Sequence, residues 1–328
     1  MVAAMDQLNA PDADAVVIGG SLAGLQAALT LGRACRRVVV IDDGRPRNAP
    51  AAHVHNFLGQ HGSTPAALLE AGRAALGDYD VALERDRVVR IEHAPVGDRL
   101  HVTSRDGRVW QTRAVVLATG LVDELPDVPG VPELWGRDVV ACPHCHGWEV
   151  RGEPLAQLSL RGMPQRGVDR ALLLSRWSSE VVLLTDGDEL DAAQRERLHA
   201  AGVAVQTQRV RRLVSHDGRL RSIEFADGTP LPVRAVFVVT RQRQQTYLAQ
   251  QLGCRHTEAG TAAGAVETDS AGRTSVPGVW ATGTTTVPAL LAIGAAGHAS
   301  SVAVAIHNDL LEQDLATAAA QSRSARPQ

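Results

Sequence analysis

Two of the four cysteines in this 328-residue chain form a C-x-x-C pair, Cys142 and Cys145, within the segment ACPHCHGWEV at residues 141–150. Such a pair can be a redox dithiol or half of a zinc site, and, because His146 follows Cys145 directly, it also matches the C-x-x-C-H signal for covalent haem attachment. In a redox dithiol the thiolate is the reacting species, and a helix start or a second thiol lowers the pKa of one sulfur. His146 could then take up the proton released when the dithiol becomes a disulfide.

The zinc interpretation requires four ligands, and the pair with a histidine supplies three of them locally. The sequence contains no second C-x-x-C and no H-x3-H, and Cys35 and Cys254 stand alone, where each is more typical of a small apolar side chain. We therefore expect no metal site.

The haem interpretation requires export, since c-type haem is attached outside the cytoplasm. The first residues, Met1 to Asp14, hold three aspartates, no lysine or arginine and no apolar core, which argues against a secretory signal. No apolar run approaches the length of a membrane span. We expect a cytoplasmic protein, where a close cysteine pair is more often catalytic or metal-binding than structural.

The composition indicates a soluble globular protein of about two domains, with 45% hydrophobic and 21% charged residues. A formal charge of −3 and an aromatic content of 3% leave neither a basic surface nor stacking groups for a nucleic acid. We therefore expect neither nucleic acid nor membrane as a partner.

A predicted strand, turn and helix near the N-terminus indicate a dinucleotide site. The apolar run 15–18 is followed by the glycine-rich turn GGSLAG at 19–24 and by helical spacing over 25–32. A second apolar run, 37–41, ends in Asp42, 18 positions beyond Gly24. The turn lets a pyrophosphate approach the helix N-terminus, and the carboxylate can accept hydrogen bonds from a ribose. Ser21 stands where the strict motif has its middle glycine.

Two further predicted strands, 113–120 and 275–284, each contain the tripeptide Ala-Thr-Gly towards their ends. The second precedes an alanine-rich predicted helix from about 288 to 311. The polar tail 316–328 shows no sustained apolar stripe, and we expect it to be frayed.

In this order, the glycine turn, the acidic strand end, the two A-T-G strands and the central C-x-x-C resemble the low-molecular-weight thioredoxin reductases, over about residues 15–309. The segment CPHCHGWEV is similar to the C-P-x-C-H-G-(Y/W)-E form found in FAD-dependent small-molecule dithiol oxidases, such as those that act on gliotoxin and holomycin. Thioredoxin reductases usually have Asp at the position of His146.

The resemblance implies an α/β fold of two Rossmann-like domains, each a three-layer ββα structure. A discontinuous FAD domain, 1–122 and 243–328, would surround a smaller NAD(P)-type domain, 123–242, that carries the C-x-x-C pair. It also implies that Cys142 exchanges with the substrate, that Cys145 faces the flavin, and that the protein is a homodimer. The residues implied to bind FAD are Gly19, Gly20, Ser21, Ala23 and Gly24 at the pyrophosphate, Asp42 at the ribose, Asn56 on the flavin side, the A-T-G end Ala118, Thr119 and Gly120, and Gly283 with Thr284 near the ribityl chain and phosphate.

The central domain lacks a second nucleotide turn. The segment 154–168 has only Gly162 and Gly167, five positions apart with a proline between them, and no G-x-G-x-x-G register fits. After the apolar run 181–184 the chain reads TDGDE, where the family carries adjacent arginines that pair with a 2′-phosphate. NADPH is therefore an unlikely direct reductant. Arg161, Arg166 and Arg170 could form an anion site, but a solvated surface is the favoured interpretation.

Together these features predict an FAD-dependent thiol-disulfide oxidoreductase. The favoured reaction is the oxidation of a small-molecule dithiol to an intramolecular disulfide, with O2 as electron acceptor and H2O2 as by-product. A thioredoxin or disulfide reductase that uses NADPH or another electron donor is the first alternative. A non-catalytic flavin-binding relative is the second.

Overall fold

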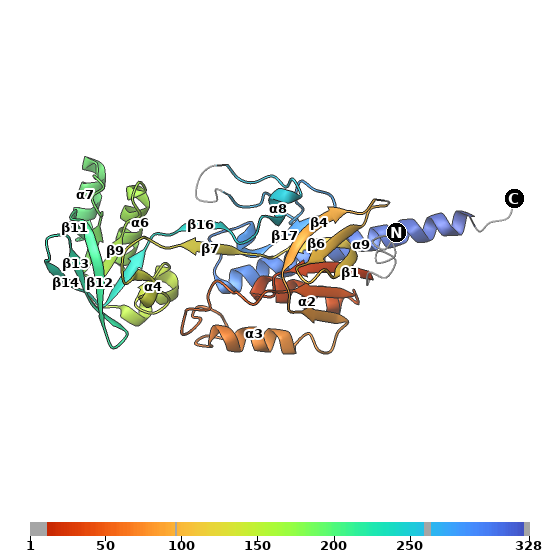
Figure 1. Ribbon diagram of the computed structural model, residues 1–328, viewed down its shortest axis with the longest axis horizontal. Coiled ribbons are helices and arrows are strands. Elements are labelled where there is room, and N and C mark those ends of the chain that lie inside the picture. The colour runs from red at the N-terminus through yellow and green to blue at the C-terminus, as the bar shows by residue number, and fades with distance from the viewer. Residues whose placement is uncertain (1–11, 96, 259–263, 325–328) are drawn as a thin grey trace. The chain divides into compact units, whose positions relative to one another are not determined.

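The computed structural model describes residues 12–95, 97–258 and 264–324 (Figure 1). The chain divides into two compact units. Unit 1 comprises Met1–Arg47, Ala66–Val122 and Arg243–Gln328, and unit 2 comprises Asn48–Pro65 and Asp123–Gln242.

Unit 1 is built on a mixed sheet with the strand order β3-β2-β1-β6-β5-β4, to which β17 adds by pairing with β6. Its strands β1, β2, β3, β6 and β17 are parallel, and β4, β5 and β6 are antiparallel neighbours. The strand bounds are β1 Asp12–Ile18, β2 Val38–Ile41, β3 Val81–Glu84, β4 Val88–His93, β5 Leu100–Ser104, β6 Val109–Leu117 and β17 Val279–Ala281.

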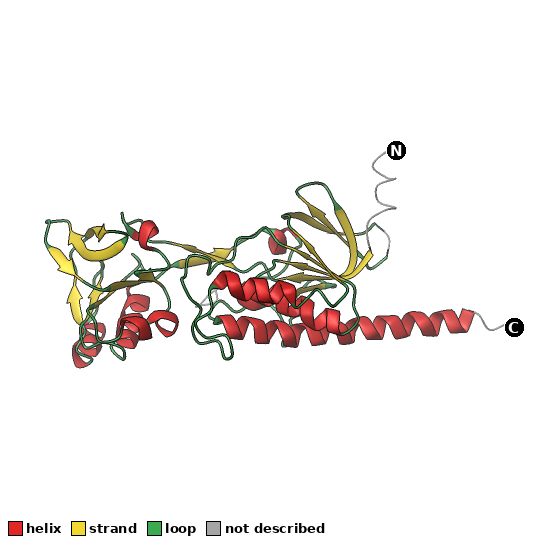
Figure 2. Ribbon diagram, turned by 90° about the horizontal axis from the view of Figure 1, so that it is seen from below, coloured by secondary structure: helices red, strands yellow, loops and turns green. Residues whose placement is uncertain are grey.

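Helices cover this sheet because its central strands are apolar on both faces. Every residue of β2 is buried, as is typical of a parallel strand with helices above and below it. On one face, α2 (Leu22–Arg33) and α9 (Ala292–Ser324) share a core with β1. On the other face, α8 (Leu248–Gln251) joins a core around Trp110. Unit 1 also holds α3 (Pro65–Ala74) and the short η3 (Gly283–Thr285). Figure 2 shows α9 as the long helix that leads to the C-terminal end.

Unit 2 has a parallel sheet with the order β11-β10-β9-β15-β8 and an antiparallel sheet β12-β13-β14. The strand bounds are β8 Val139–Val140, β9 Leu155–Leu158, β10 Val181–Leu184, β11 Ala204–Gln206, β12 Val210–His216, β13 Arg219–Phe225, β14 Pro230–Pro232 and β15 Ala235–Val238. Its helices are α4 Val131–Leu134, α5 Pro143–His146, α6 Pro164–Leu174, α7 Ala192–Ala200 and the short η2 Trp148–Val150. Two strands, β7 (Leu121–Glu124) and β16 (Arg241–Gln244), pair where the chain passes between the units.

The predicted fold class, α/β with two Rossmann-like domains, is confirmed: each unit has a set of parallel strands packed against helices. One predicted boundary differs. The segment 48–65, predicted to belong to the first FAD segment, groups with unit 2. It does so because Pro50 packs so closely on Gly136 that a Cβ there would lie 2.4 Å from the Pro50 carbonyl oxygen.

The C-terminal tail was predicted to fray, and that prediction is wrong for the residues described, since α9 continues to Ser324. Asp314 holds this part of the helix through ion pairs with Arg36 and Arg113, at 2.6 and 2.5 Å. The predicted strand 275–284 is also shorter than expected, because only Val279–Ala281 pair with β6. Among the described residues, no helix combines the length and the apolar character that a membrane span requires.

Candidate active site

The two cysteines are joined by a disulfide at the start of α5, with their Cα atoms 5.3 Å apart. Cys142 is the N-cap residue, and Pro143 supplies the first helical position, where its missing N–H costs nothing. The amide groups of Cys145 and His146 both donate to the carbonyl oxygen of Cys142, at 3.1 and 3.2 Å. The turn thus closes the pair into the geometry of a redox-active disulfide.

Aromatic side chains surround this turn. A Cβ on Gly147 would lie 2.9 Å from the ring of Trp177, so only glycine allows the indole to approach the end of α5. His144 meets the same ring edge-on, with centroids 5.6 Å apart, which favours a packing role for it. Trp148 is exposed, and the guanidinium of Arg151 lies 3.9 Å from its ring centroid.

His146 is partly buried beside the disulfide. Burial lowers the pKa of its imidazole below the usual value, and the field of His55 acts in the same direction, whereas a hydrogen bond with the Cys142 backbone and the field of Glu149 oppose them. Its Nδ1 is buried without a hydrogen-bond partner among the described residues. At neutral pH the ring is therefore neutral, and it can accept a proton.

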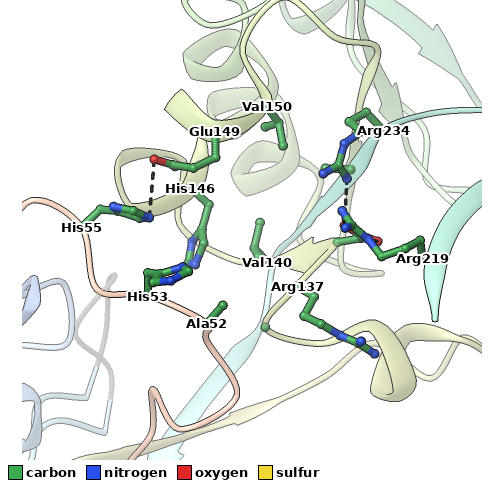
Figure 3. Close-up of a pocket in the computed structure, with 13 residues that line it drawn as sticks. Ala52, His53, His55, Arg137, Val140, His146, Glu149, Val150, Arg219 and Arg234 are labelled. Carbon is green, nitrogen blue, oxygen red and sulfur yellow. Dashed lines mark hydrogen bonds and ion pairs between the residues drawn. The ribbon is translucent and has the colours of Figure 1, made fainter. Parts of the chain in front are cut away.

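A cavity of about 240 Å³ in unit 2 reaches His146 (Figure 3). Its lining includes Glu149 and two histidines from the loop 48–65, His53 and His55. His55 Nε2 lies 3.5 Å from Glu149 Oε1. The sequence analysis missed His55 because nothing in the spacing of residues 48–65 indicates that this loop folds against η2.

Asp138 anchors the opposite wall of the cavity and is almost fully buried, with 2% of its side chain exposed. Arg219 donates to both of its oxygens, at 2.9 and 2.8 Å, and Arg234 donates at 2.8 Å. Burial alone would raise the pKa of Asp138, but these bonds and one from the Leu220 amide outweigh it and lower the pKa to about 2. The carboxylate is therefore a permanent charge of the cavity wall.

The glycines of the turn at 19–24 permit close backbone contacts in unit 1. Gly19 has φ +102°, and a Cβ there would lie 2.5 Å from the carbonyl oxygen of Ala118. A Cβ on Gly24 would lie 1.7 Å from the Gly19 oxygen, which no side chain can tolerate. The Gly20 amide donates to Asp42 Oδ1 at 2.9 Å, and Arg73 lies 3.7 Å from Asp42 Oδ2.

The A-T-G strand ends meet at this turn. A Cβ on Gly283 would lie 2.7 Å from Ala23, and one on Gly120 would lie 3.4 Å from the Thr284 hydroxyl. Ser21 is the N-cap of α2, and its side chain makes no capping bond. The structure thus brings together the predicted residues Gly19, Gly20, Ser21, Ala23, Gly24, Asp42, Ala118, Thr119, Gly120, Gly283 and Thr284. A helix start without a side-chain cap, flanked by glycines that admit close approach, fits the pyrophosphate of FAD.

The predicted flavin-side residue Asn56 lies on a loop that groups with unit 2, and its role at the flavin stays a prediction. Its backbone is left-handed, with φ +58°, and its amide donates to His61 Nδ1 at 3.4 Å.

Two supporting residues of the glycine site escaped the sequence analysis. Thr285 accepts a hydrogen bond from the Gly120 amide at 2.7 Å, and His298 Nδ1 accepts one from the Gly283 amide at 3.2 Å. His298 thus fixes the A-T-G turn at Gly283. Burial also lowers its pKa, so the ring is neutral and can accept that bond.

The turn between β9 and α6 in unit 2 is occupied by protein groups. The Gly162 amide donates to Asp188 Oδ2 at 2.8 Å, and Arg161 lies 3.6 Å from Asp186 Oδ2. A Cβ on Gly167 would lie 2.6 Å from the Ser159 hydroxyl, so this glycine serves helix packing. Within the described ranges, no group of three or more His, Cys, Asp or Glu side chains is arranged to hold a metal ion.

Comparison with known proteins agrees with this arrangement. Residues 13–307 match the family model described as pyridine nucleotide-disulphide oxidoreductase. The thioredoxin reductase sirT of Leptosphaeria maculans is 30% identical over 319 residues, which cover 92% of this chain and 96% of the relative. The crystal structure of HlmI superimposes with a TM-score of 0.90 at 44% identity and covers 96% of this chain and 98% of that one. An oxidoreductase from Agrobacterium tumefaciens gives a TM-score of 0.84 at 32% identity, over 92% of this chain and 99% of that one.

Proposed function

The chain belongs to the pyridine nucleotide-disulphide oxidoreductase family and is a thioredoxin reductase-like oxidoreductase, and from this premise we propose that it is an FAD-dependent dithiol oxidase. Its substrate is a small-molecule dithiol, its product is the intramolecular disulfide, and its electron acceptor is O2. The observation that carries the proposal is the acidic character of the β9–α6 turn, where Asp188 accepts from the Gly162 amide and Asp186 lies beside Arg161, because carboxylates there disfavour the 2′-phosphate of NADPH.

The first half of the reaction is a thiol-disulfide exchange at α5. A substrate thiolate attacks Cys142 Sγ, the bond between Cys142 and Cys145 breaks, and Cys145 leaves as a thiolate. The second substrate thiol, deprotonated by His146, attacks the substrate sulfur of the mixed disulfide and releases Cys142. The substrate loses two electrons, the cysteine pair gains them, and His146 holds one of the released protons.

Membership of the family implies FAD as the cofactor. The glycine site in unit 1 fits it, because Gly19, Gly20 and Ser21 lie at the start of α2. When bound, FAD would accept two electrons from the cysteine pair and deliver them to O2, giving H2O2. The protein's contribution there is to hold the cofactor. Gly24 and Gly283 allow the close approach, while Thr285 and His298 keep the two A-T-G turns in place.

Direct reduction by NADPH is disfavoured by charge as well as by geometry. Asp188 accepts from the Gly162 amide, and Arg161, a cation that could pair with a phosphate, lies beside Asp186. Carboxylates at this turn repel a phosphate group, so binding requires breaking both contacts.

Anaerobic mixing tests the direction of electron flow. We expect a dithiol such as dithiothreitol to bleach the flavin of the purified protein rapidly, and NADPH to leave it oxidised. Admission of O2 should then restore the flavin and produce one H2O2 for each dithiol consumed. The variant Cys142→Ser is the control for reaction through the cysteine pair. Rapid bleaching by NADPH would overturn the oxidase proposal and favour a reductase, the activity that the name of the sirT relative states.

A further inference from the structure

The loop 48–65 places a second histidine at the dithiol site. Its ends are held by reciprocal backbone bonds, from Val54 to Ser63 and from Gly62 to Val54, at 2.7 and 2.9 Å. Asn56 turns the chain in the left-handed region, and Pro50 is pinned against Gly136. The loop thereby presents His55 to Glu149, one turn beyond His146 (Figure 3).

The pair formed by His55 and Glu149 is partly shielded from water. The side chain of His55 is 19% exposed and that of Glu149 is 39% exposed, with Nε2 and Oε1 3.5 Å apart. A single histidine–carboxylate contact of this kind at 3.5 Å contributes little to stability, so the folded state does not require it. This makes a functional reason for the contact worth testing.

Two imidazole nitrogens in this cavity are buried without protein partners. Nδ1 of His55 and Nδ1 of His146 are both inaccessible, and neither makes a hydrogen bond among the described residues. Buried polar atoms are nearly always paired, and those that are not often belong to catalytic groups. Both histidines line the same cavity, and each therefore keeps one nitrogen uncommitted at the place where protons leave the dithiol.

We infer that His55 is a positioning residue of the dithiol site, which holds the Glu149 carboxylate in the wall of the cavity that His146 also lines, so that the negative charge stabilises the imidazolium formed on proton transfer. The inference rests on the proposed thiol oxidation, and it assigns no bond-breaking step to His55. The proton goes from the substrate thiol to His146, and the electrons go to the bond between Cys142 and Cys145.

The electrostatic surroundings of His146 are mixed. The charged and titratable groups that line its cavity are His53 and His55 on the loop, Arg137 and Asp138 before β8, Glu149 on η2, Arg219 on β13 and Arg234 before β15. Asp138 is neutralised by Arg219 and Arg234. After burial and a hydrogen bond with the Cys142 backbone, Glu149 and His55 are the groups that shift the pKa of the imidazole, and they act in opposite directions.

The experiment measures the reduction of the protein disulfide in the intact holoenzyme. Under anaerobic conditions, enzyme and dithiothreitol are mixed, quenched with an alkylating reagent and analysed by mass spectrometry. The exposed Cys35 is alkylated in every sample, and two further alkylated cysteines report the reduction of the disulfide. This readout does not depend on O2 as acceptor. A failure of the oxidase proposal would therefore leave it intact.

Three variants distinguish the contact of His55 with Glu149 from the volume that its side chain fills. His55→Leu keeps the volume and removes the contact, and we expect the exchange to slow about tenfold. His55→Gln retains an N–H that can reach Glu149, and we expect it to recover most of the rate. His216→Gln removes an exposed histidine–carboxylate pair of the same unit, His216 with Asp217, and should leave the rate unchanged.

The pH profile provides the second readout. Because Glu149 raises the pKa of His146, Glu149→Gln should move the acid limb to lower pH, and His55→Leu, which releases the Glu149 carboxylate, should move it in the same direction. A shift to higher pH in His55→Leu would report the direct field of His55 instead and would overturn the positioning role. The double variant should be no slower than the slower single variant, since both changes disrupt one arrangement. An unchanged rate and profile in His55→Leu, or strictly multiplicative effects in the double variant, would overturn the inference, provided that the thermal unfolding of the variants matches that of the parent.

Discussion

The imidazole of His146 is the acid–base group of the proposed exchange, and its protonation should set the acid limit of the reaction. Because burial lowers its pKa, the neutral form persists below the pH at which an exposed histidine would be protonated. We expect His146→Asn to slow the exchange by about 100-fold at neutral pH and to abolish the acid limb. Stopped-flow mixing with dithiothreitol over a range of pH measures both effects. His144→Asn is the control, and an intact acid limb in the His146 variant would contradict the assignment.

The ion pairs of Asp138 should stabilise the protein in a pH-dependent way. Its folded pKa, about 2, lies below the unfolded value near 3.8, so its contribution is present above pH 4 and is lost as the pH falls towards 2. We expect Asp138→Asn to destabilise the protein by about 2 kcal/mol at neutral pH, because Arg219 and Arg234 lose their charged partner.

Urea unfolding followed by circular dichroism at pH 7 and at acid pH checks this difference. Asp217→Asn, which removes an exposed carboxylate, is the control and should change the unfolding midpoint little. A constant difference between parent and Asp138→Asn from pH 7 down to pH 2 would count against the buried ion pairs as its cause.

The connection between β1 and α2 is the element on which cofactor binding depends. Gly24→Ala would place a methyl group 1.7 Å from the Gly19 carbonyl oxygen, and the turn must open to accept it. We expect this variant to be purified without flavin. Gly297→Ala in α9 meets nothing within 4 Å and should retain flavin, with a stability gain of about 1 kcal/mol from helix propensity. The ratio of flavin to protein absorbance measures the outcome, and a yellow Gly24→Ala protein would contradict the proposed site.

The elements that carry short local signals were predictable, and those that depend on distant contacts were not. Glycine turns and buried Val-rich strands can be predicted from sequence. The turn from β1 to α2 requires glycines, and burial of β2 on both faces requires apolar residues. His55 and Thr285 carry no such pattern. Each acquires its role only when a loop or a helix start folds against a partner distant in sequence, Glu149 in one case and Gly120 in the other.

On the scale of the whole molecule, the cysteine pair and the glycine site belong to different units of the chain. The resemblance to the thioredoxin reductases implied this division, with the C-x-x-C between the two A-T-G strands. The placement of 48–65 with unit 2 could not be read in the same way, because it follows from the packing of Pro50 on Gly136.

The resemblance to dimeric flavoproteins predicts a homodimer, and α9 offers a surface that would suit one. Val304, Leu311 and Leu315 are 50%, 41% and 55% exposed, at spacings that place them near one face of the helix. We expect sedimentation analysis to show a dimer, and Leu311→Glu with Leu315→Glu to shift it towards monomer. Glu312→Gln, on the same exposed turn, serves as the control. A monomeric parent protein would refute the expectation.

The disulfide between Cys142 and Cys145 gives the resting protein an oxidising capacity of its own. In the proposed reaction, a chain that contains this bond and holds FAD can convert two equivalents of dithiol before O2 takes part, one at the cysteine pair and one through the flavin that the pair reduces. Product should then appear in two phases, an initial burst of up to two disulfides for each chain and a slower steady rate set by reoxidation. The size of that burst counts the competent active sites in a preparation, which makes the closed cysteine pair an internal standard for the enzyme's own concentration.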